Sequence, residues 1–143
     1  MNEQDVNNVA SIERDVYVFP WSAGNFRDSL AAGYQCTCAQ MDRQLVGYSI
    51  VMTALDEAHL LNLAVARAWQ GQGIGRRMME HLIAGARAEK RENFYLEVRP
   101  SNIAGRRLYD QLGFRELGLR RGYYPAVGGR EDALFLGLRL KAA

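Results

Sequence analysis

The segment over residues 70–77 combines three glycines with two arginines, a combination that can bind a phosphate group. Gly71, Gly73 and Gly75 let an anion approach the backbone without a side chain in the way. An amphipathic stretch follows, and the first turn of a helix has N–H groups without internal partners and a positive dipole end. The segment therefore predicts a phosphate site at a helix N-terminus, while a flexible turn with solvated arginines is the plainer alternative.

Two other phosphate motifs do not fit this spacing. A Walker loop ends in Gly-Lys followed by Ser or Thr, and the segment has no such triplet. A dinucleotide fingerprint needs G-x-G-x-x-G and an acidic residue about 20 positions later, whereas this chain has G-x-G-x-G and then Tyr95. The sequence therefore argues against both kinds of nucleotide site.

Glu97 and Tyr109 are the side chains best suited to acid–base chemistry. Glu97 interrupts an otherwise apolar strand-like stretch, where a carboxylate can serve as a general base. Tyr109 lies in the helical stretch that follows, and its phenol could donate a proton. Each has a structural alternative: Glu97 could pair with an arginine such as Arg99, and Tyr109 could pack in the core beside Leu108 and Leu112.

The cysteines and histidines give little support for a metal or redox site. Cys36 and Cys38 are separated by one residue, so in a strand both would face one side as small apolar groups. This spacing differs from that of zinc and redox motifs, and His59 and His81 stand isolated from any cluster. We expect all four side chains to pack at the core edge or the surface, and we expect no metal cofactor.

The composition fits one compact domain that acts without nucleic acid or membrane. With 143 residues, 48% of them hydrophobic, the chain can bury a core without disulfides, so we expect a single domain over residues 1–143. The net charge of +2 is unlike the clustered basic excess of many nucleic-acid binders. Apolar runs are too short to span a bilayer and the N-terminus is polar, so a cytoplasmic location is the default expectation. The sequence leaves the oligomeric state open.

Ten elements are expected, in the order α-α-β-β-β-α-β-α-β-β. Apolar spacing of three and four residues predicts the helices, and β-branched or alternating stretches predict the strands. The predicted helices cover residues 5–18, a segment capped by Ser22 and ending near Gly33, 75–91 and 102–112. The predicted strands cover residues 34–41, 44–54, 59–65, 94–98, 114–123 and 133–140. Parallel strands joined by a crossover helix are expected at the centre, with antiparallel neighbours at the edges.

The spacing Q/R-x-x-G-x-G/A, met by Gln70, Gly73 and Gly75, and this order of elements resemble the GNAT superfamily of N-acetyltransferases. The resemblance implies an α/β (α+β) fold, the GNAT fold, whose mixed and mostly antiparallel sheet has a parallel splayed pair at the cofactor site and flanking helices. It also implies that loop amides hold the pyrophosphate of acetyl-CoA while the preceding strand pairs with the pantetheine arm. The implied cofactor residues are Leu63, Ala64, Val65, Gln70, Gly71, Gln72, Gly73, Ile74, Gly75 and Arg76.

The stretch over residues 96–102, with Leu108-Tyr109 and Leu112-Gly113-Phe114, is similar to the bacterial ribosomal-protein alanine N-acetyltransferases, the RimI type. Further matches are residues 19–22, 56–58, 123–125 and 129–133. This resemblance implies that Glu97 is the general base, acting through water, and that Tyr109 is the general acid. It also implies that Asn102 contacts the cofactor.

The resemblance implies a protein or peptide N-terminus as the amine acceptor, namely the N-terminal alanine of a small-subunit ribosomal protein. The candidate substrate-binding residues flank the cleft opposite the cofactor and are Trp21, Glu57, Tyr123, Tyr124 and Arg130. Each has a structural alternative, since the aromatic side chains could be core and Arg130 could form a surface ion pair. Two other functions stay open: acetylation of lysine, a polyamine or another small amine, and a CoA-binding module that performs no chemistry.

Overall fold

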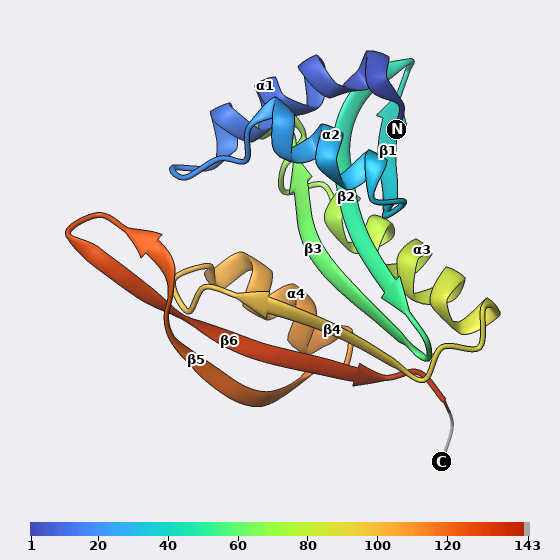
Figure 1. Cartoon of the computed structure of the whole chain (residues 1–143), viewed down its shortest axis with the longest axis vertical. Coiled ribbons are helices and arrows are strands. Elements are labelled where there is room, and N and C mark those ends of the chain that lie inside the picture. The colour runs from blue at the N-terminus through green and yellow to red at the C-terminus, as the bar shows by residue number, and fades with distance from the viewer. Residues whose placement is uncertain (142–143) are drawn as a thin grey trace. The chain divides into compact units, whose positions relative to one another are not determined.

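A computed structural model describes residues 1–141, and its six strands form one mixed sheet in the order β1-β2-β3-β4-β6-β5 (Figure 1). The strands are β1 (Gln35–Met41), β2 (Gln44–Ala54), β3 (Glu57–Val65), β4 (Asn93–Val98), β5 (Arg115–Ala126) and β6 (Gly129–Arg139). The helices are α1 (Val6–Val16), α2 (Ala23–Ala31), α3 (Ile74–Ala88) and α4 (Ile103–Gln111). The predicted succession of elements is confirmed.

The chain forms two compact units. The first comprises Met1–Thr53 and Leu61–Met79, and the second comprises Ala54–Leu60 and the chain from residue 80 onward. β3 and α3 contribute residues to both units. The expectation of a single domain stays a prediction. Within residues 1–141, no helix has the length and apolar character needed to cross a bilayer.

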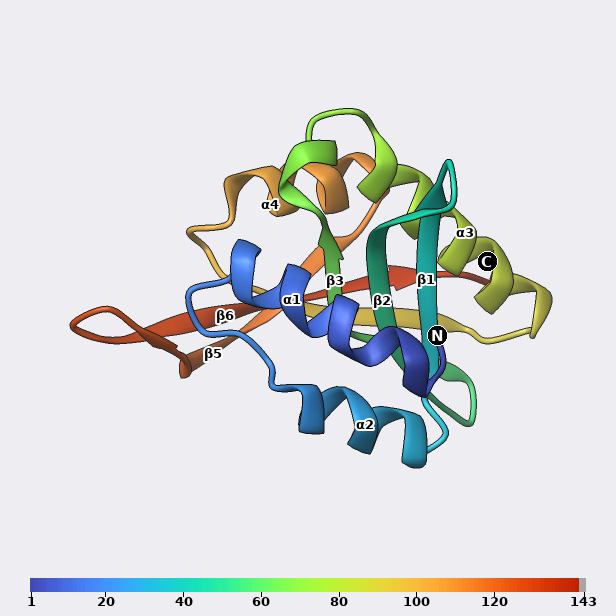
Figure 2. The same cartoon turned by 90° about the horizontal axis from the view of Figure 1, so that it is seen from above.

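In the first unit, α1 and α2 lie over one face of the β1–β2 hairpin (Figure 2). Val6 and Val9 of α1 pack with Phe26 of α2 against Tyr48 and Ile50 of β2, and all five side chains are fully buried. Alternate β2 residues face the other way, because side chains of a strand alternate between its faces. A Cβ at position 47 would lie 2.9 Å from the Met78 sulfur, so α3 backs directly onto that second face.

In the second unit, β4, β6 and β5 are antiparallel, with Glu97 of β4 opposite Phe135 of β6. β3 pairs with β4 in parallel over residues 57–60 and 93–96, which confirms the predicted parallel pair. Asn102 caps α4, and its side chain accepts a hydrogen bond from the Gly105 N–H.

The last two strands are longer than the sequence predicts. β5 continues to Ala126 and β6 begins at Gly129, because Tyr124 pairs with Glu131 and Pro125 pairs with Arg130. Proline has no N–H to donate, which an edge strand such as β5 tolerates. The Tyr-Tyr-Pro segment therefore belongs to a hairpin arm and not to a loop.

Candidate active site

The glycine-rich turn has the backbone geometry of an anion site. Gly71 and Gly73 adopt φ of +77° and +80°, values that residues other than glycine rarely adopt. A Cβ at either position would meet open space. The Arg77 N–H donates to the Gly73 carbonyl at 3.1 Å as the first bond of α3. The amides of Ile74 and Gly75 precede this bond, so the helix supplies no acceptor for them. These amides can bind an anion.

The end of β3 that precedes the turn has one edge on β2 and one edge away from it. The Ala66 N–H donates to Val46 of β2 at 2.7 Å, so Ala64, two residues earlier, faces the same edge. Leu63 and Val65 therefore present their backbone groups to the opposite edge. Of the three predicted pantetheine-pairing residues, these two have the geometry to pair with an added strand.

Both carbonyls on that edge already accept a hydrogen bond from the chain's own side chains. The Tyr17 hydroxyl donates to the Leu63 carbonyl at 2.5 Å, and the Gln70 amide donates to the Val65 carbonyl at 3.0 Å. Gln70 thereby ties the start of the glycine-rich turn to β3.

The Glu97 carboxylate is held by side chains from two other strands. Its Oε2 lies 2.6 Å from His59 Nε2 on β3, and its Oε1 lies 3.4 Å from Arg120 Nε on β5. The Glu97 side chain is only 9% exposed. The arginine that pairs with Glu97 is thus Arg120, whereas Arg99 contacts Glu131 and the Pro125 carbonyl.

Aromatic rings line the same face of the sheet beside this carboxylate. The Phe135 ring lies opposite Glu97 and stacks on Tyr95 at 5.4 Å. The His59 ring lies 6.5 Å from Phe135, and the Arg120 guanidinium lies 5.2 Å above it. These contacts fix the directions of both groups that hold Glu97.

Tyr124 lies near this carboxylate, and Tyr109 lies near Tyr124. Burial raises the pKa of Tyr109 to about 12, so its phenol carries a proton at neutral pH. Burial also raises the pKa of Tyr124, and the charge of Glu97 raises it further, with a smaller contribution from Tyr109. Tyr124 therefore lies within electrostatic reach of the predicted base and the predicted acid.

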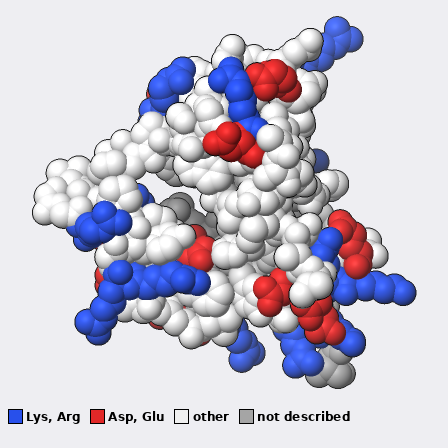
Figure 3. Space-filling model, viewed as in Figure 1, with Lys and Arg blue, Asp and Glu red and all other residues white. Residues whose placement is uncertain are grey.

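The hairpin residues predicted to bind the amine acceptor form one cluster. Tyr123 and Tyr124 meet edge to face at 4.9 Å, and the Arg99 guanidinium lies 4.4 Å above the Tyr124 ring. Arg130 donates to the carbonyls of Gly122 and Tyr123, at 2.5 and 3.2 Å. Basic side chains accordingly gather beside the hairpin (Figure 3).

Trp21 belongs to the first unit, and Glu57 lies at the start of β3 in the second unit. Trp21 donates its backbone N–H to the buried Glu13 carboxylate at 3.0 Å, and its ring packs 5.3 Å from Phe26. Glu57 starts β3 opposite Asn93, four residues along β4 from Glu97, or roughly 13 Å at the usual strand rise. Their roles in binding the amine acceptor stay predictions.

His59 is the residue that sequence reasoning missed. It was expected to be isolated, but it forms the 2.6 Å pair with Glu97. His59 pairs in register with Tyr95, and Glu97 follows Tyr95 by two residues on the same face. A polar residue in each of two adjacent parallel strands was the available signal. By contrast, Cys36 and Cys38 pack against the first unit's core as expected, and burial raises the pKa of both thiols.

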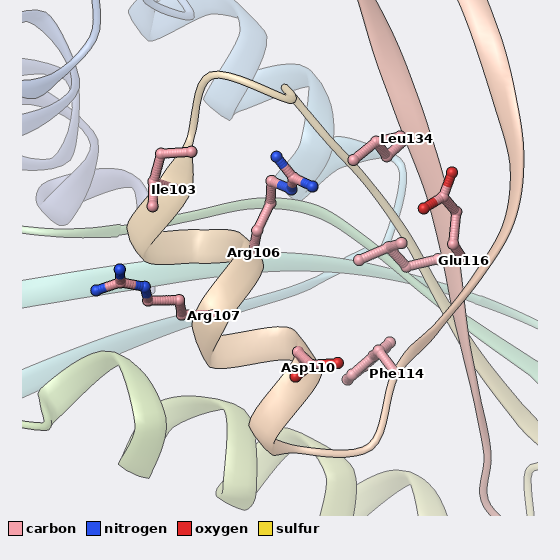
Figure 4. A pocket seen from close by; sticks show the side chains of 8 residues that line it. Ile103, Arg106, Arg107, Asp110, Phe114, Glu116 and Leu134 are labelled. Carbon is pink, nitrogen blue, oxygen red and sulfur yellow. The ribbon is translucent and has the colours of Figure 1, made fainter.

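A separate open pocket of about 310 Å³ lies between α4 and the strands β5 and β6 (Figure 4). None of the predicted site residues lines it. The charged residues that line it are two arginines and two acids, so their formal charges cancel; they are Arg106, Arg107, Asp110 and Glu116. Within residues 1–141, no group of three His, Cys, Asp or Glu side chains is arranged to hold a metal ion.

The model of the acetyltransferase (GNAT) family matches residues 6–114 of the chain. The chain belongs to the GNAT family. It is 39% identical to the "[Ribosomal protein bS18]-alanine N-acetyltransferase" of Escherichia coli over 127 residues, which cover 89% of this chain and 86% of that protein. The protein of the same name in Haemophilus ducreyi is 37% identical over 139 residues, covering 96% of each chain.

The crystal structure of the Escherichia coli ribosomal-protein alanine N-acetyltransferase matches the fold with a TM-score of 0.94 at 36% identity. The match covers 100% of this chain and 92% of that chain. The protein is therefore an acetyltransferase of the GNAT type, closely related to these alanine N-acetyltransferases. The parallel pair β3–β4 in a mixed sheet flanked by helices matches this fold.

Proposed function

We propose that this GNAT protein transfers the acetyl group of acetyl-CoA to the α-amine of the N-terminal alanine of a small-subunit ribosomal protein. The carrying observation is the Glu97 carboxylate, nearly buried and held from two sides by His59 and Arg120. The names of relatives up to 39% identical support the choice of amine acceptor.

The turn and the edge of β3 that faces away from β2 are the parts that fit the cofactor. The amides of residues 71–76 would hold the pyrophosphate at the start of α3, and Leu63 and Val65 would pair with the pantetheine arm. Asn102 is the remaining residue that is predicted to contact acetyl-CoA. Tyr17 shares the Leu63 carbonyl with any such ligand, since a carbonyl oxygen has two lone pairs. Bound acetyl-CoA supplies an electrophilic thioester carbonyl.

Glu97 and Tyr109 divide the proton transfers between them. Glu97, through one water, removes a proton from the α-ammonium group of the acceptor, and His59 can take that proton on toward solvent. The neutral amine then forms a C–N bond to the carbonyl carbon. As the C–S bond breaks, Tyr109 donates its proton to the sulfur and regains one from the new amide nitrogen. A proton held firmly by Tyr109 until this step suits a general acid.

An α-amine is an easy acceptor for this site. Its reference pKa is near 8, about two units below that of lysine, so less base strength is needed to neutralise it. Tyr123 and Tyr124 are the candidates for contact with the peptide that follows the amine, because both lie on the hairpin beside Glu97.

Steady-state transfer to an alanine-starting peptide tests the proposal. Glu97→Gln and Tyr109→Phe should each lower kcat by about 10²-fold or more with little change in acetyl-CoA affinity. Glu89→Gln, which changes an exposed glutamate paired with Arg91, is the matched control and should leave kcat unchanged.

The other outcomes reassign the function. An unchanged kcat in both variants would remove the two assigned roles. A clear preference for lysine side chains or polyamines over peptides would change the amine acceptor. Acetyl-CoA binding by calorimetry without turnover of any amine would leave a CoA-binding module.

A further inference from the structure

The β5–β6 hairpin contains a bulge immediately before the two tyrosines. Arg120 pairs with Ala133 and Tyr124 pairs with Glu131, so three residues of β5, 121–123, stand opposite the single residue Asp132. Gly122 adopts φ of +59° at the centre of this bulge. A bulge re-aims the side chains that follow it, here Tyr123 and Tyr124.

Two side chains of β6 hold both sides of the bulged glycine. Asp132 accepts a hydrogen bond from the Gly122 N–H at 2.8 Å. Arg130 donates to the Gly122 carbonyl at 2.5 Å and to the Tyr123 carbonyl at 3.2 Å. Arg130 and Asp132 are two residues apart, so they project from the same face of β6. Side chains therefore hold the backbone of residues 121–123 where the ladder is interrupted, immediately before Tyr124 rejoins it opposite Glu131.

The residue between them fixes the other side of the hairpin. Glu131 accepts hydrogen bonds from the Ser101 N–H and hydroxyl, both at 2.9 Å, and pairs with Arg99 at 3.3 Å. Arg99 in turn lies over the Tyr124 ring. Residues 130–132 thus connect the tyrosine pair to the segment between β4, which carries Glu97, and α4, which carries Tyr109.

We propose that Arg130 and Asp132 are positioning residues that determine how a peptide acceptor is held, by fixing the bulge that aims Tyr123 and Tyr124. This inference rests on the proposed function. It replaces direct substrate contact by Arg130 with action through the backbone. A peptide extends past its amine to the hairpin, whereas a single-residue amine does not. The contacts of Arg130 and Asp132 with the bulge, together the clamp, therefore favour peptide acceptors over single-residue amines.

The test compares an alanine-starting hexapeptide with alanine amide. Asp132→Ala removes the acceptor for the Gly122 N–H and should lower kcat/KM for the hexapeptide about tenfold or more, mostly through KM. The rate with alanine amide should stay within about twofold, because this substrate ends before the hairpin. Asp132→Asn keeps an oxygen that can accept the same bond and should restore most of the hexapeptide rate.

Arg130 supplies a second, independent variant. Arg130→Lys places one ammonium group where a planar fork reached two carbonyls, so it should recover little of the activity that Arg130→Ala loses with the hexapeptide. Acetyl-CoA affinity and circular dichroism of each variant report on folding, and both should match the unmodified protein.

The results separate this inference from the proposed function. An unmodified protein that acetylates neither substrate overturns both. An active protein in which Asp132→Ala slows hexapeptide and alanine amide equally, or slows neither, overturns only the clamp.

Discussion

Each oxygen of the Glu97 carboxylate has its own partner. His59 holds one oxygen from β3, and Arg120 holds the other from β5. Two fixed partners leave the carboxylate little rotational freedom, which favours a base that must meet its proton in one direction. The two partners differ in chemistry, since a guanidinium keeps its proton whereas an imidazole has a second ring nitrogen through which a proton can be passed on.

Replacing His59 separates orientation from proton transfer. Gln in its place can still donate a hydrogen bond to Glu97 but cannot carry a proton onward. We expect His59→Gln to lower kcat with an alanine-starting peptide about tenfold or more and to leave acetyl-CoA affinity unchanged. An unaltered kcat would limit His59 to a structural contact.

Because Tyr109 is buried, we expect the free energy of unfolding to fall at alkaline pH. Its pKa is raised from 10.0 to about 12 by burial, so the folded protein keeps a proton that the unfolded chain releases. The contribution is complete below pH 10 and is lost as the pH rises toward 12, by about 2–3 kcal/mol for this one group.

Tyr109→Phe should remove that part of the pH dependence. Urea unfolding from pH 8 to 11 measures it, as the difference in slope between the variant and the unmodified protein. Tyr48 and Tyr124 also have raised pKa values and are present in both proteins, so the contribution of Tyr48 cancels, and that of Tyr124 changes only by the small part that Tyr109 supplies. Equal slopes would show that the phenol is as accessible as one in the unfolded chain.

For single residues, the sequence indicated which side chains were candidates but not which side chains they contact. Glu97 and Tyr109 were recognisable from their motifs. The pair of Glu97 with His59, 38 residues apart in the chain, depends on the register of two strands, and the pair with Arg120 crosses β6. Neither register nor strand order can be read from local spacing.

The glycine-rich turn is the element whose conformation most directly limits its residues. Gly73→Ala introduces a Cβ at φ of +80°, which costs about 1–2 kcal/mol, and it also alters the amides that face the ligand. We expect acetyl-CoA affinity to fall about tenfold or more, measured by calorimetry.

Gly33 offers the matched control. It follows α2 with φ of +79°, and a Cβ there also meets open space. Gly33→Ala should lower the free energy of unfolding by a similar amount while leaving acetyl-CoA affinity unchanged. If both substitutions weakened acetyl-CoA binding equally, general destabilisation and not the turn would explain the loss.

Element boundaries followed from capping chemistry where the sequence had it. Ser22 and Asn102 cap α2 and α4 with their side chains, so those starts were predictable. β5 was predicted to end at position 123. The bulge clamped by β6 continues the hairpin past that point, and such side-chain-to-backbone contacts have no local signature.

For the whole molecule, cofactor binding should appear as added stability. A ligand that binds only the folded chain at 100 times its Kd contributes about 2.7 kcal/mol. Thermal unfolding should therefore shift upward by several degrees with acetyl-CoA. NAD should produce no shift, because the dinucleotide fingerprint is missing. A shift of the same size with both would indicate general anion binding.

The arrangement of the sheet was predictable only in part. The helix between β3 and β4 predicted a parallel pair, since a crossover joins parallel neighbours. The position of β6 between β4 and β5 is set by long-range packing, with Leu96 opposite Leu136 and Val98 opposite Leu134. That order is what brings Arg120 across Phe135 to Glu97.

The outer edge of β5 also affects how molecules meet in a concentrated solution. An edge strand that exposes Leu117 and Leu119 is an aggregation hazard, because it could recruit the strand of another molecule. Its ladder is interrupted twice, between Glu116 and Gly118 and between Arg120 and Tyr124. An incoming strand thus lacks a straight row of donors and acceptors to follow. The irregularity that aims two tyrosines also keeps the sheet from growing into a fibril.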